Sequence, residues 1–234
     1  MNDNDNFDAC ALLDATKQIA LDAGRRILEI YGTDFAVEHK DDKSPLTAAD
    51  MASHKAIVAG LQRLTPEIPI LSEESANIPF SERSGWQRYW LIDPLDGTRE
   101  FIKRNGEFTV NIALIHAGRA ELGIVHVPVS GMTYFACAGG GAFKQQAGQA
   151  AEAVHVRKLP KGPVMVAGSR SHSGDSLLRF LDKLGPHELV SMGSALKLCL
   201  VAEGAADIYP RLGLTSEWDT AAAQCVVEAA GGQV

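Results

Sequence analysis

The sequence predicts a layered α/β fold, in which an antiparallel sheet and a half of alternating strands and helices share one apolar core. Three apolar runs, at 108–116, 121–127 and 132–137, are separated by turn signals at 117–119 and 128–131, which is typical of an antiparallel meander. Further along the chain, short strands and helices alternate, as they do in layered α/β domains. The 234 residues suffice for one large domain or two closely packed halves.

Two helices and two strands are expected before the meander. Apolar residues at helical spacing predict a helix over 7–31, which Gly32 would end, and a second helix over 48–64. Short apolar runs at 68–71 and 89–92 predict strands, each followed within two residues by a carboxylate. Because sites in layered α/β folds form at the carboxyl ends of strands, these two strand ends are candidate site positions.

The C-terminal half is expected to alternate between strands and helices. The predicted strands are 164–167, 189–192 and 206–209, and the predicted helices are 175–184, 194–203 and 220–230. A change of pattern near 150–160 predicts a division into an N-terminal half, 1–155, and a C-terminal half, 156–234.

Charge and composition argue against several classes of protein. The formal net charge of −7 disfavours a protein that coats nucleic acid, because a phosphate backbone requires basic surfaces. No apolar run reaches membrane-spanning length, and the N-terminus lacks the basic start and apolar core of a signal peptide. The four cysteines, Cys10, Cys137, Cys199 and Cys225, form no C-x-x-C pair. We therefore expect reduced thiols in a cytosolic protein, and neither a zinc site nor a redox motif.

The most informative feature is the pair of carboxylates in the segment Asp93-Pro94-Leu95-Asp96-Gly97-Thr98. Both follow an apolar strand, where a carboxylate is costly unless it is paired or binds a cation. Oxygen ligands suit hard divalent cations such as Mg²⁺, which leave coordination positions for phosphate oxygens. Pro94 restricts the chain, and Gly97 lets the backbone approach a ligand closely. The segment therefore favours a Mg²⁺-dependent phosphatase.

Glu73 and Asp219 are expected to join this pair, because each also lies just past a strand or just ahead of a helix. Four converging carboxylates would repel one another unless cations bridged them. Two metal ions in such a site clamp the attacking water and the leaving oxygen of an in-line displacement. A structural interpretation stays open for each residue: Asp219 can cap the helix over 220–230, and Glu73 can be a solvated carboxylate.

Asp50 has two interpretations that are compatible with each other. In Thr47-Ala48-Ala49-Asp50 it stands at the third helical position of a capping-box variant. In the functional interpretation, Asp50 orients the hydroxyl of Thr98, which takes a proton from the attacking water.

Candidate contacts for the rest of a ligand come from the C-terminal half. Ser169, Arg170 and His172 lie between a predicted strand and a predicted helix, and a guanidinium can hold a second phosphate with paired hydrogen bonds. Lys197 lies on a predicted helix near Ser194. A solvated surface position is an equally good interpretation of these basic residues.

Three segments resemble, in order, the three signatures of the inositol monophosphatase superfamily: Ser72-Glu73-Glu74, then 93–98, then Trp218-Asp219-Thr220-Ala221-Ala222. The similarity is closest to the CysQ-type 3′(2′),5′-bisphosphate nucleotidases, because Arg99-Glu100-Phe101 follows the Gly-Thr pair. Inositol monophosphatases tend to carry Thr-Asn-Phe or Ala-Asn-Tyr there. The segments 169–172 and 193–204 also resemble the nucleotidases, and the resemblance covers nearly the whole chain.

The resemblance implies a five-layer αβαβα sandwich and a lithium-sensitive enzyme of sulfur assimilation that requires two or three Mg²⁺ ions. It implies that 3′-phosphoadenosine 5′-phosphate is hydrolysed to AMP and phosphate by a metal-activated water. The implied metal ligands are Glu73, Asp93, the Leu95 carbonyl, Asp96 and Asp219, and the implied catalytic residues are Asp50, Glu73 and Thr98. The implied substrate contacts are Glu73, Asp96, Gly97, Thr98, Arg99, Ser169, Arg170, His172, Ser194, Lys197 and Asp219.

Other interpretations are an inositol monophosphatase or sugar bisphosphatase with the same metals, and a nucleotide-sensing module without turnover. A haloacid-dehalogenase phosphatase is disfavoured, because its two aspartates are two residues apart and these are three apart. We expect a small bisphosphate nucleotide as the ligand of a monomer or homodimer, located in the cytoplasm or peripherally on the inner face of the cell membrane. The resembled proteins continue past Gly231-Gly232 with at least one more strand, so we expect an unpaired sheet edge but no lost metal ligand.

Overall fold

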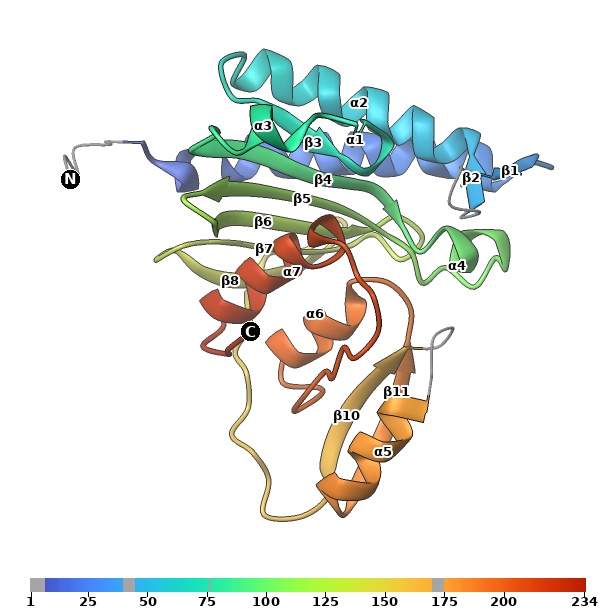
Figure 1. Cartoon of the computed structure of the whole chain (residues 1–234), viewed down its shortest axis with the longest axis vertical. Coiled ribbons are helices and arrows are strands. Elements are labelled where there is room, and N and C mark those ends of the chain that lie inside the picture. Colours follow the sequence, from blue (N-terminus) through green and yellow to red (C-terminus); the bar gives the residue numbers. More distant parts are fainter. Residues whose placement is uncertain (1–6, 40–44, 76, 170–174) are drawn as a thin grey trace.

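The computed structural model describes residues 7–39, 45–75, 77–169 and 175–234, and its layers confirm the expected αβαβα sandwich (Figure 1). Helices α1 (Leu13–Tyr31) and α2 (Ala48–Leu64) form the first layer, and a seven-stranded sheet forms the second. Helices α6 (Leu196–Ala202) and α7 (Glu217–Ala229) lie on the other face of that sheet. A two-stranded sheet and α5 (Asp175–Leu184) complete the stack.

The large sheet contains the predicted antiparallel meander. Its strands, in spatial order, are β3 (Ile70–Ser72), β4 (Arg88–Asp96), β5 (Thr109–His116), β6 (Arg119–Val127), β7 (Met132–Cys137), β8 (Gly141–Gln146) and β9 (Glu152–Ala153). Strand β3 pairs with β4 in parallel, and all the other neighbours are antiparallel. Ala117 and Gly118 both have positive φ in the tight turn between β5 and β6, as such hairpin turns require.

The sheet is apolar on both faces because a helical layer covers each one. Side chains such as Trp90, Ile92 and Leu122 pack with Ala20 and Ile57 of the first helical layer. On the opposite face, residues of alternate position along the same strands pack against α6 and α7. Burial on both faces explains why these strands appear in the sequence as nearly continuous apolar runs.

Helix α7 packs unusually closely on β6, and small residues on both elements make this possible. Ala221, Ala222 and Ala223 lie in its buried face. A Cβ atom at Gly123 of β6 would lie 2.2 Å from the carbonyl oxygen of Ala222, which is closer than real Cβ contacts. The close approach fixes the height of α7 above the sheet at Ala222.

The small sheet joins β10 (Val164–Ser169) and β11 (His187–Met192) in parallel. The prediction of a strand at 206–209 is wrong, because this segment forms a single bridge, between Ile208 and Val166, and no strand. The division of the chain at 155/156 stays a prediction. Helix α7 belongs by sequence to the second half, yet it packs on the first half's sheet.

Several short elements were not expected from the sequence. The helix predicted over 7–31 begins as the 3-10 turn η1 (Ala9–Leu12), which Asp8 caps, before α1 starts. The other short elements are β1 (Val37–His39), β2 (Pro45–Thr47), η2 (Glu73–Ser75), α3 (Phe80–Arg83) and α4 (Thr98–Ile102).

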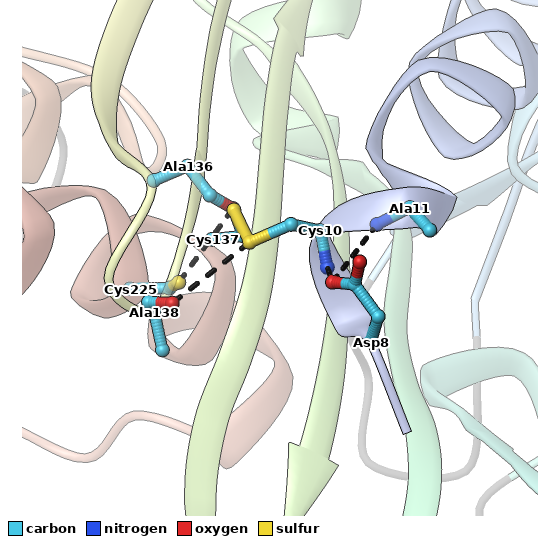
Figure 2. Close-up of a disulfide and its surroundings, with 7 residues drawn as sticks. All are labelled: Asp8, Cys10, Ala11, Ala136, Cys137, Ala138 and Cys225. Atoms are coloured by element: carbon cyan, nitrogen blue, oxygen red, sulfur yellow. Dashed lines mark hydrogen bonds between the residues drawn. A yellow bond between two sulfur atoms is a disulfide. The ribbon is translucent and has the colours of Figure 1, made fainter. Parts of the chain in front are cut away.

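A disulfide between Cys10 and Cys137 corrects the expectation that all four cysteines are reduced (Figure 2). It ties η1, at the start of the chain, to the end of β7, with a Cα–Cα distance of 5.4 Å. A Cβ atom at Gly140 would lie 2.3 Å from Cys137 Sγ, so the absence of a side chain there leaves room for the bond. Cys199 and Cys225 are free and buried. Cys10 and Cys137 are 127 residues apart in the chain, so their spacing in the sequence gave no indication of the pairing.

Of the helices in the described residues, none has both the length and the apolar character that crossing a membrane would require.

Candidate active site

A β-bulge in β4 brings Asp93 and Asp96 to the same cavity. Asp93 is opposite Asn111 of β5 and Asp96 is opposite Thr109, so three steps along β4 match two along β5. In a regular strand, residues three apart point to opposite faces, and the one extra residue cancels this alternation. Pro94 lies in the bulge, where its missing N–H breaks no ladder bond. The strand was expected to end at Asp93, but it continues through the bulge to Asp96.

Helix α2 and the chain itself hold the bulge in place. Ser53 Oγ of α2 donates to the Pro94 carbonyl at 2.7 Å, and the Leu95 amide donates to Asp93 Oδ1 at 3.1 Å. Gly97 follows with φ of 96°, a left-handed conformation that turns the chain from β4 into α4. The turn places Thr98 beside the two aspartates.

The expected metal-ligating residues surround one cavity of about 280 Å³. Glu73 comes from η2 after β3, Asp93, Leu95 and Asp96 from the end of β4, and Asp219 from the first turn of α7. Gly97, Thr98, Arg99, Ser169, Ser194 and Lys197 line the same cavity. The predictions for Arg170 and His172 fall on residues outside the part of the chain that the structure describes.

In both Asp96 and Asp219, one carboxylate oxygen, Oδ2, accepts hydrogen bonds from neighbouring backbone and side-chain groups. Asp96 Oδ2 accepts from the Ala195 amide at 2.6 Å, from Asn111 Nδ2 at 3.2 Å and from Thr109 Oγ1 at 3.4 Å. Asp219 Oδ2 accepts from the Ser216 amide and from Thr215 Oγ1, both at 2.9 Å. Among the described residues, no hydrogen bond goes to Oδ1 of either one. In each carboxylate, the hydrogen bonds to Oδ2 fix the orientation, and Oδ1 is available to bind a cation.

The role of Asp219 as a helix cap differs from the sequence-based expectation. The helix predicted over 220–230 begins three residues earlier, and Ser216 is its N-cap. Asp219 stands at the third helical position and closes a capping box with Ser216. The capping role and a position on the cavity wall thus belong to the same side chain.

Asp50 makes the contacts that both of its sequence-based interpretations require. Its Oδ2 accepts from the Thr47 amide at 2.8 Å and from Thr47 Oγ1 at 2.6 Å, which completes the capping box of α2. Its Oδ1 accepts from Thr98 Oγ1 at 3.3 Å. Asp50 is 1% exposed, and its hydrogen bond with Thr98 connects its carboxylate to a residue that lines the cavity.

The carboxylates disturb one another strongly. Burial raises the pKa of Asp93 well above its usual value, and the charges of Glu73, Asp96 and Asp219 raise it further. Proximity of the Glu73 side chain adds to the upward shift of the Asp93 pKa. Burial raises the pKa of Asp96 to about 7, with Lys197 opposing the shift and Asp219 adding to it. Together, these four carboxyl groups bring more negative charge into the cavity than the residues around them can neutralise.

This donor set fits divalent cations that keep some of their waters. In the described part of the chain, no three Asp, Glu, His or Cys side chains form a group that could hold a metal ion by themselves. Mg²⁺ does not require such a cage, because it binds through one or two carboxylates and completes its octahedron with water and phosphate oxygens. The available Oδ1 atoms of Asp96 and Asp219, the carboxyl groups of Asp93 and Glu73, and the Leu95 carbonyl are oxygen donors that match that preference.

Lys197, which the sequence left open between a surface position and a contact with the ligand, lines the cavity, is 6% exposed and donates to the Ser194 carbonyl. The sequence analysis did not assign several other residues of the cavity to the site. Glu100, Tyr209, Arg211 and Thr215 also line the cavity. Tyr209 is the last residue of the predicted strand at 206–209 and Arg211 is the second residue after it, so the strand-end argument used for the aspartates also applies to them.

The five layers and the carboxylates at the strand ends define one family of proteins. The chain belongs to the inositol monophosphatase family, whose model matches residues 8–234. The similarity found in the sequence motifs is thereby confirmed.

Within the family, the chain is similar to proteins named 3′(2′),5′-bisphosphate nucleotidase CysQ. The one from Escherichia coli (strain K12) is 51% identical over 225 residues, which cover 95% of this chain and 89% of the relative. The one from Salmonella typhimurium is 50% identical over 225 residues, with the same coverage. The crystal structure of CysQ from Bacteroides thetaiotaomicron matches with a TM-score of 0.82 and 40% identity, and covers 97% of this chain and 88% of that one.

Proposed function

We propose that this protein is a Mg²⁺-dependent phosphatase that removes the 3′-phosphate of 3′-phosphoadenosine 5′-phosphate and gives AMP and phosphate. The observation that carries the proposal is the convergence of Glu73, Asp93, Asp96 and Asp219 on one cavity, beside the Thr98–Asp50 hydrogen bond. Identity of about half the residues to proteins named 3′(2′),5′-bisphosphate nucleotidase CysQ supports the choice of a bisphosphate nucleotide.

The residues proposed to hold two or three Mg²⁺ ions are Glu73, Asp93, Asp96 and Asp219, together with the carbonyl of Leu95. When bound, Mg²⁺ neutralises phosphate charge and lowers the pKa of a coordinated water. Asp96 and Asp219 are held for this task by the hydrogen bonds to their Oδ2 atoms. Gly97 and Thr98 lie where the scissile phosphate would enter, at the end of the bulge.

Thr98 and Asp50 are proposed to move the proton of the attacking water. Because the Thr98 hydroxyl donates to Asp50 Oδ1, a lone pair of Thr98 Oγ1 remains available to accept a proton from the cavity. Asp50 is buried and fixed by Thr47, so it stays in place to accept the hydroxyl proton in turn. Glu73, which lines the same cavity, is also proposed to act on the attacking water.

Phosphate release from a small panel of substrates tests this function. We expect 3′-phosphoadenosine 5′-phosphate to exceed inositol 1-phosphate by at least about tenfold in kcat/KM, a difference of roughly 1.4 kcal/mol. Turnover should require Mg²⁺, fall on addition of lithium, and disappear in Asp93→Asn, which keeps the shape of the side chain but loses its charge. Faster hydrolysis of inositol 1-phosphate or of a sugar bisphosphate would assign the chain to another activity of the family. Turnover that survives removal of all divalent cations would refute the metal-dependent mechanism.

Location and assembly are separate proposals. We place the protein in the cytoplasm, in keeping with a nucleotide substrate, and treat it as a monomer or homodimer. The Cys10–Cys137 disulfide argues in the other direction, because disulfides persist mainly in oxidising compartments. Thiol labelling of the protein in intact cells decides whether the bond forms there, and light scattering gives the assembly state. No finding supports an association with the inner membrane face.

A further inference from the structure

Three polar residues on one face of α2 each contact a different segment of the candidate site. Ser53 and His54 are three and four residues from Asp50, so all three side chains leave the helix on the same side. Asp50 reaches Thr98 at the start of α4. The other two contact the bulge of β4 and the end of β3, and the proposed reaction assigns no role to either.

The ladder of the sheet ends just before the carboxylates that follow β3 and β4. Strand β3 is at the edge of the sheet, and its three residues pair with β4 in parallel. Among the described residues, the last pair is Ser72 with Ile92, directly before Glu73 and Asp93. Beyond this pair, β3 turns into η2 and β4 enters its bulge. The spacing between Glu73 and Asp93 therefore depends on contacts other than the hydrogen bonds of the ladder.

Ser53 of α2 holds the β4 segment. Its side chain is fully buried, and its Oγ donates to the Pro94 carbonyl at 2.7 Å. At the other end of the same peptide group, the Leu95 amide donates to Asp93 Oδ1 at 3.1 Å. The peptide between Pro94 and Leu95 is thus held at both ends. Because peptide groups are planar, these two hydrogen bonds also restrict the direction of the Leu95 carbonyl that comes next.

His54 of α2 holds the β3 segment. Its Nδ1 lies 2.9 Å from Ser72 Oγ, which also accepts from the Glu74 amide at 3.3 Å. Ser72 is fully buried and directly precedes Glu73. Burial, together with the charge of Lys55, lowers the pKa of His54, which favours the neutral ring. With its proton on Nε2, a neutral ring accepts the Ser72 hydroxyl hydrogen at Nδ1, so Ser72 uses its oxygen for η2 and its hydrogen for α2.

We propose that Ser53 and His54 are positioning residues that set the spacing between the carboxylates after β3 and after β4, and thereby the affinity of the site for divalent cations. The inference rests on the proposed function, in which these carboxylates bind the cations together. Neither residue is among the described residues that line the cavity, so each acts through the group that it holds, the Pro94 carbonyl or the Ser72 hydroxyl. Loss of a partner that orients a metal-binding group typically weakens metal binding by about 10- to 100-fold.

Binding of Mn²⁺ to the metal-free protein, followed by the electron paramagnetic resonance of the free ion, tests the proposal without turnover. In Ser53→Ala and His54→Leu the Kd should rise by at least about tenfold, whereas His54→Asn, whose side-chain oxygen can take the place of Nδ1, should stay within about threefold of wild type. Leucine is the better helix former, so a role in helix stability alone would rank His54→Leu above His54→Asn. The opposite order in Mn²⁺ affinity is therefore specific to the hydrogen bond with Ser72.

The matched control is Thr16→Val, which removes another fully buried hydroxyl that donates to a carbonyl, that of Leu12 at the start of α1. It should lower the urea midpoint as Ser53→Ala does but leave the Kd for Mn²⁺ within about twofold of wild type. Circular dichroism reports whether each variant is folded, and if Ser53→Ala is not, the two His54 variants decide. The proposal is overturned if folded Ser53→Ala and His54→Leu bind Mn²⁺ as wild type does, or if Thr16→Val weakens binding equally.

Kinetics separate this inference from the proposed function. In Ser53→Ala and His54→Leu, the Mg²⁺ concentration for half-maximal hydrolysis of 3′-phosphoadenosine 5′-phosphate should rise by at least about tenfold, while kcat at saturating Mg²⁺ falls by less than about threefold. If wild type binds Mn²⁺ but does not hydrolyse the nucleotide, the proposed function fails, and the binding comparison still decides the positioning role. If wild type is active and the variants require no more Mg²⁺ than it does, only the positioning role fails.

Discussion

Thr98 donates its hydroxyl hydrogen to Asp50 Oδ1 at 3.3 Å, while Asp50 Oδ2 closes the capping box of its own helix. One carboxylate thus connects the start of α2 to the start of α4. The residue that stabilises the helix also positions the hydroxyl proposed to take a proton, and the two contributions can be separated by substitution.

Asp50→Asn should lower kcat by about 100-fold or more, within the range of general-base catalysis, because an amide cannot accept the relayed proton. Thr47→Ala should lower the free energy of unfolding by about 1 kcal/mol, since it removes a helix cap, and leave kcat within about threefold of wild type. Steady-state kinetics and urea unfolding of both variants measure this. A parallel fall of activity and stability in both would show that Asp50 acts only as a cap.

The stability of the metal-free protein should fall as pH rises from about 4 to about 7. Asp96 has a folded-state pKa of about 7 and a usual pKa of 3.8, so between these values the folded state binds more protons than the unfolded state. Asp93 is shifted in the same direction. His126, whose pKa burial lowers to about 4, contributes the opposite trend between that value and 6.5.

Comparison with Asp96→Asn isolates the aspartate from the histidine. The decline in melting temperature from pH 4.5 to 7.5 in EDTA should be steeper in wild type than in the variant. Excess Mg²⁺ should reduce the difference, because cations favour the ionised carboxylates. Superimposable pH profiles of the two proteins would contradict the assignment.

Gly123→Ala should destabilise the protein by about 2–3 kcal/mol, because the added methyl would collide with the Ala222 carbonyl rather than with a flexible side chain. Since α7 also carries Asp219, moving the helix should raise the Mg²⁺ concentration required for half-maximal activity. The matched control is Gly162→Ala, where nothing lies within 4 Å of the added carbon. Unchanged Mg²⁺ dependence in a destabilised Gly123→Ala would show that the helix adjusts without moving Asp219.

Reduction of the Cys10–Cys137 disulfide should lower stability by about 2–4 kcal/mol without changing kcat. The pairing register places Cys137 level with Leu122, Leu114 and Trp90, at the opposite end of the sheet from Asp96. Unfolding with and without a thiol reductant measures the loss. In Cys10→Ser/Cys137→Ser the reductant should have no effect, which separates this bond from reaction at Cys199 or Cys225.

The layered fold and the line of carboxylates were predictable because they depend on local patterns. Apolar periodicity marks strands and helices, and acidic residues directly after strands mark the edge where a site forms. Helix α2 begins and ends at the predicted residues, and so does strand β7. These features need no knowledge of which segments meet in space.

The remaining features depend on tertiary contacts. The bulge at Pro94 requires a partner strand that is one residue shorter over the same stretch, so the sequence indicated only a strand end. Arg211 follows a segment that pairs by a single bridge, so only its place after a predicted strand separated it in the sequence from a solvated arginine. Cys10 and Cys137 become partners only after η1 has been placed against β7.

The disulfide gives the chain the topology of a closed ring with a tail. The ring runs from Cys10 to Cys137 and contains Asp50, Glu73, Asp93, Asp96 and Thr98, whereas Asp219 lies on the tail. A single cut in the backbone inside the ring leaves one covalent molecule, whose two new ends are both still attached. A cut in the tail before Asp219 frees the segment that carries it. After a cut inside the ring, one sulfur–sulfur bond therefore keeps all five of these ring residues in one covalent molecule with Asp219, whereas after a cut in the tail Asp219 is held only by the packing of α7.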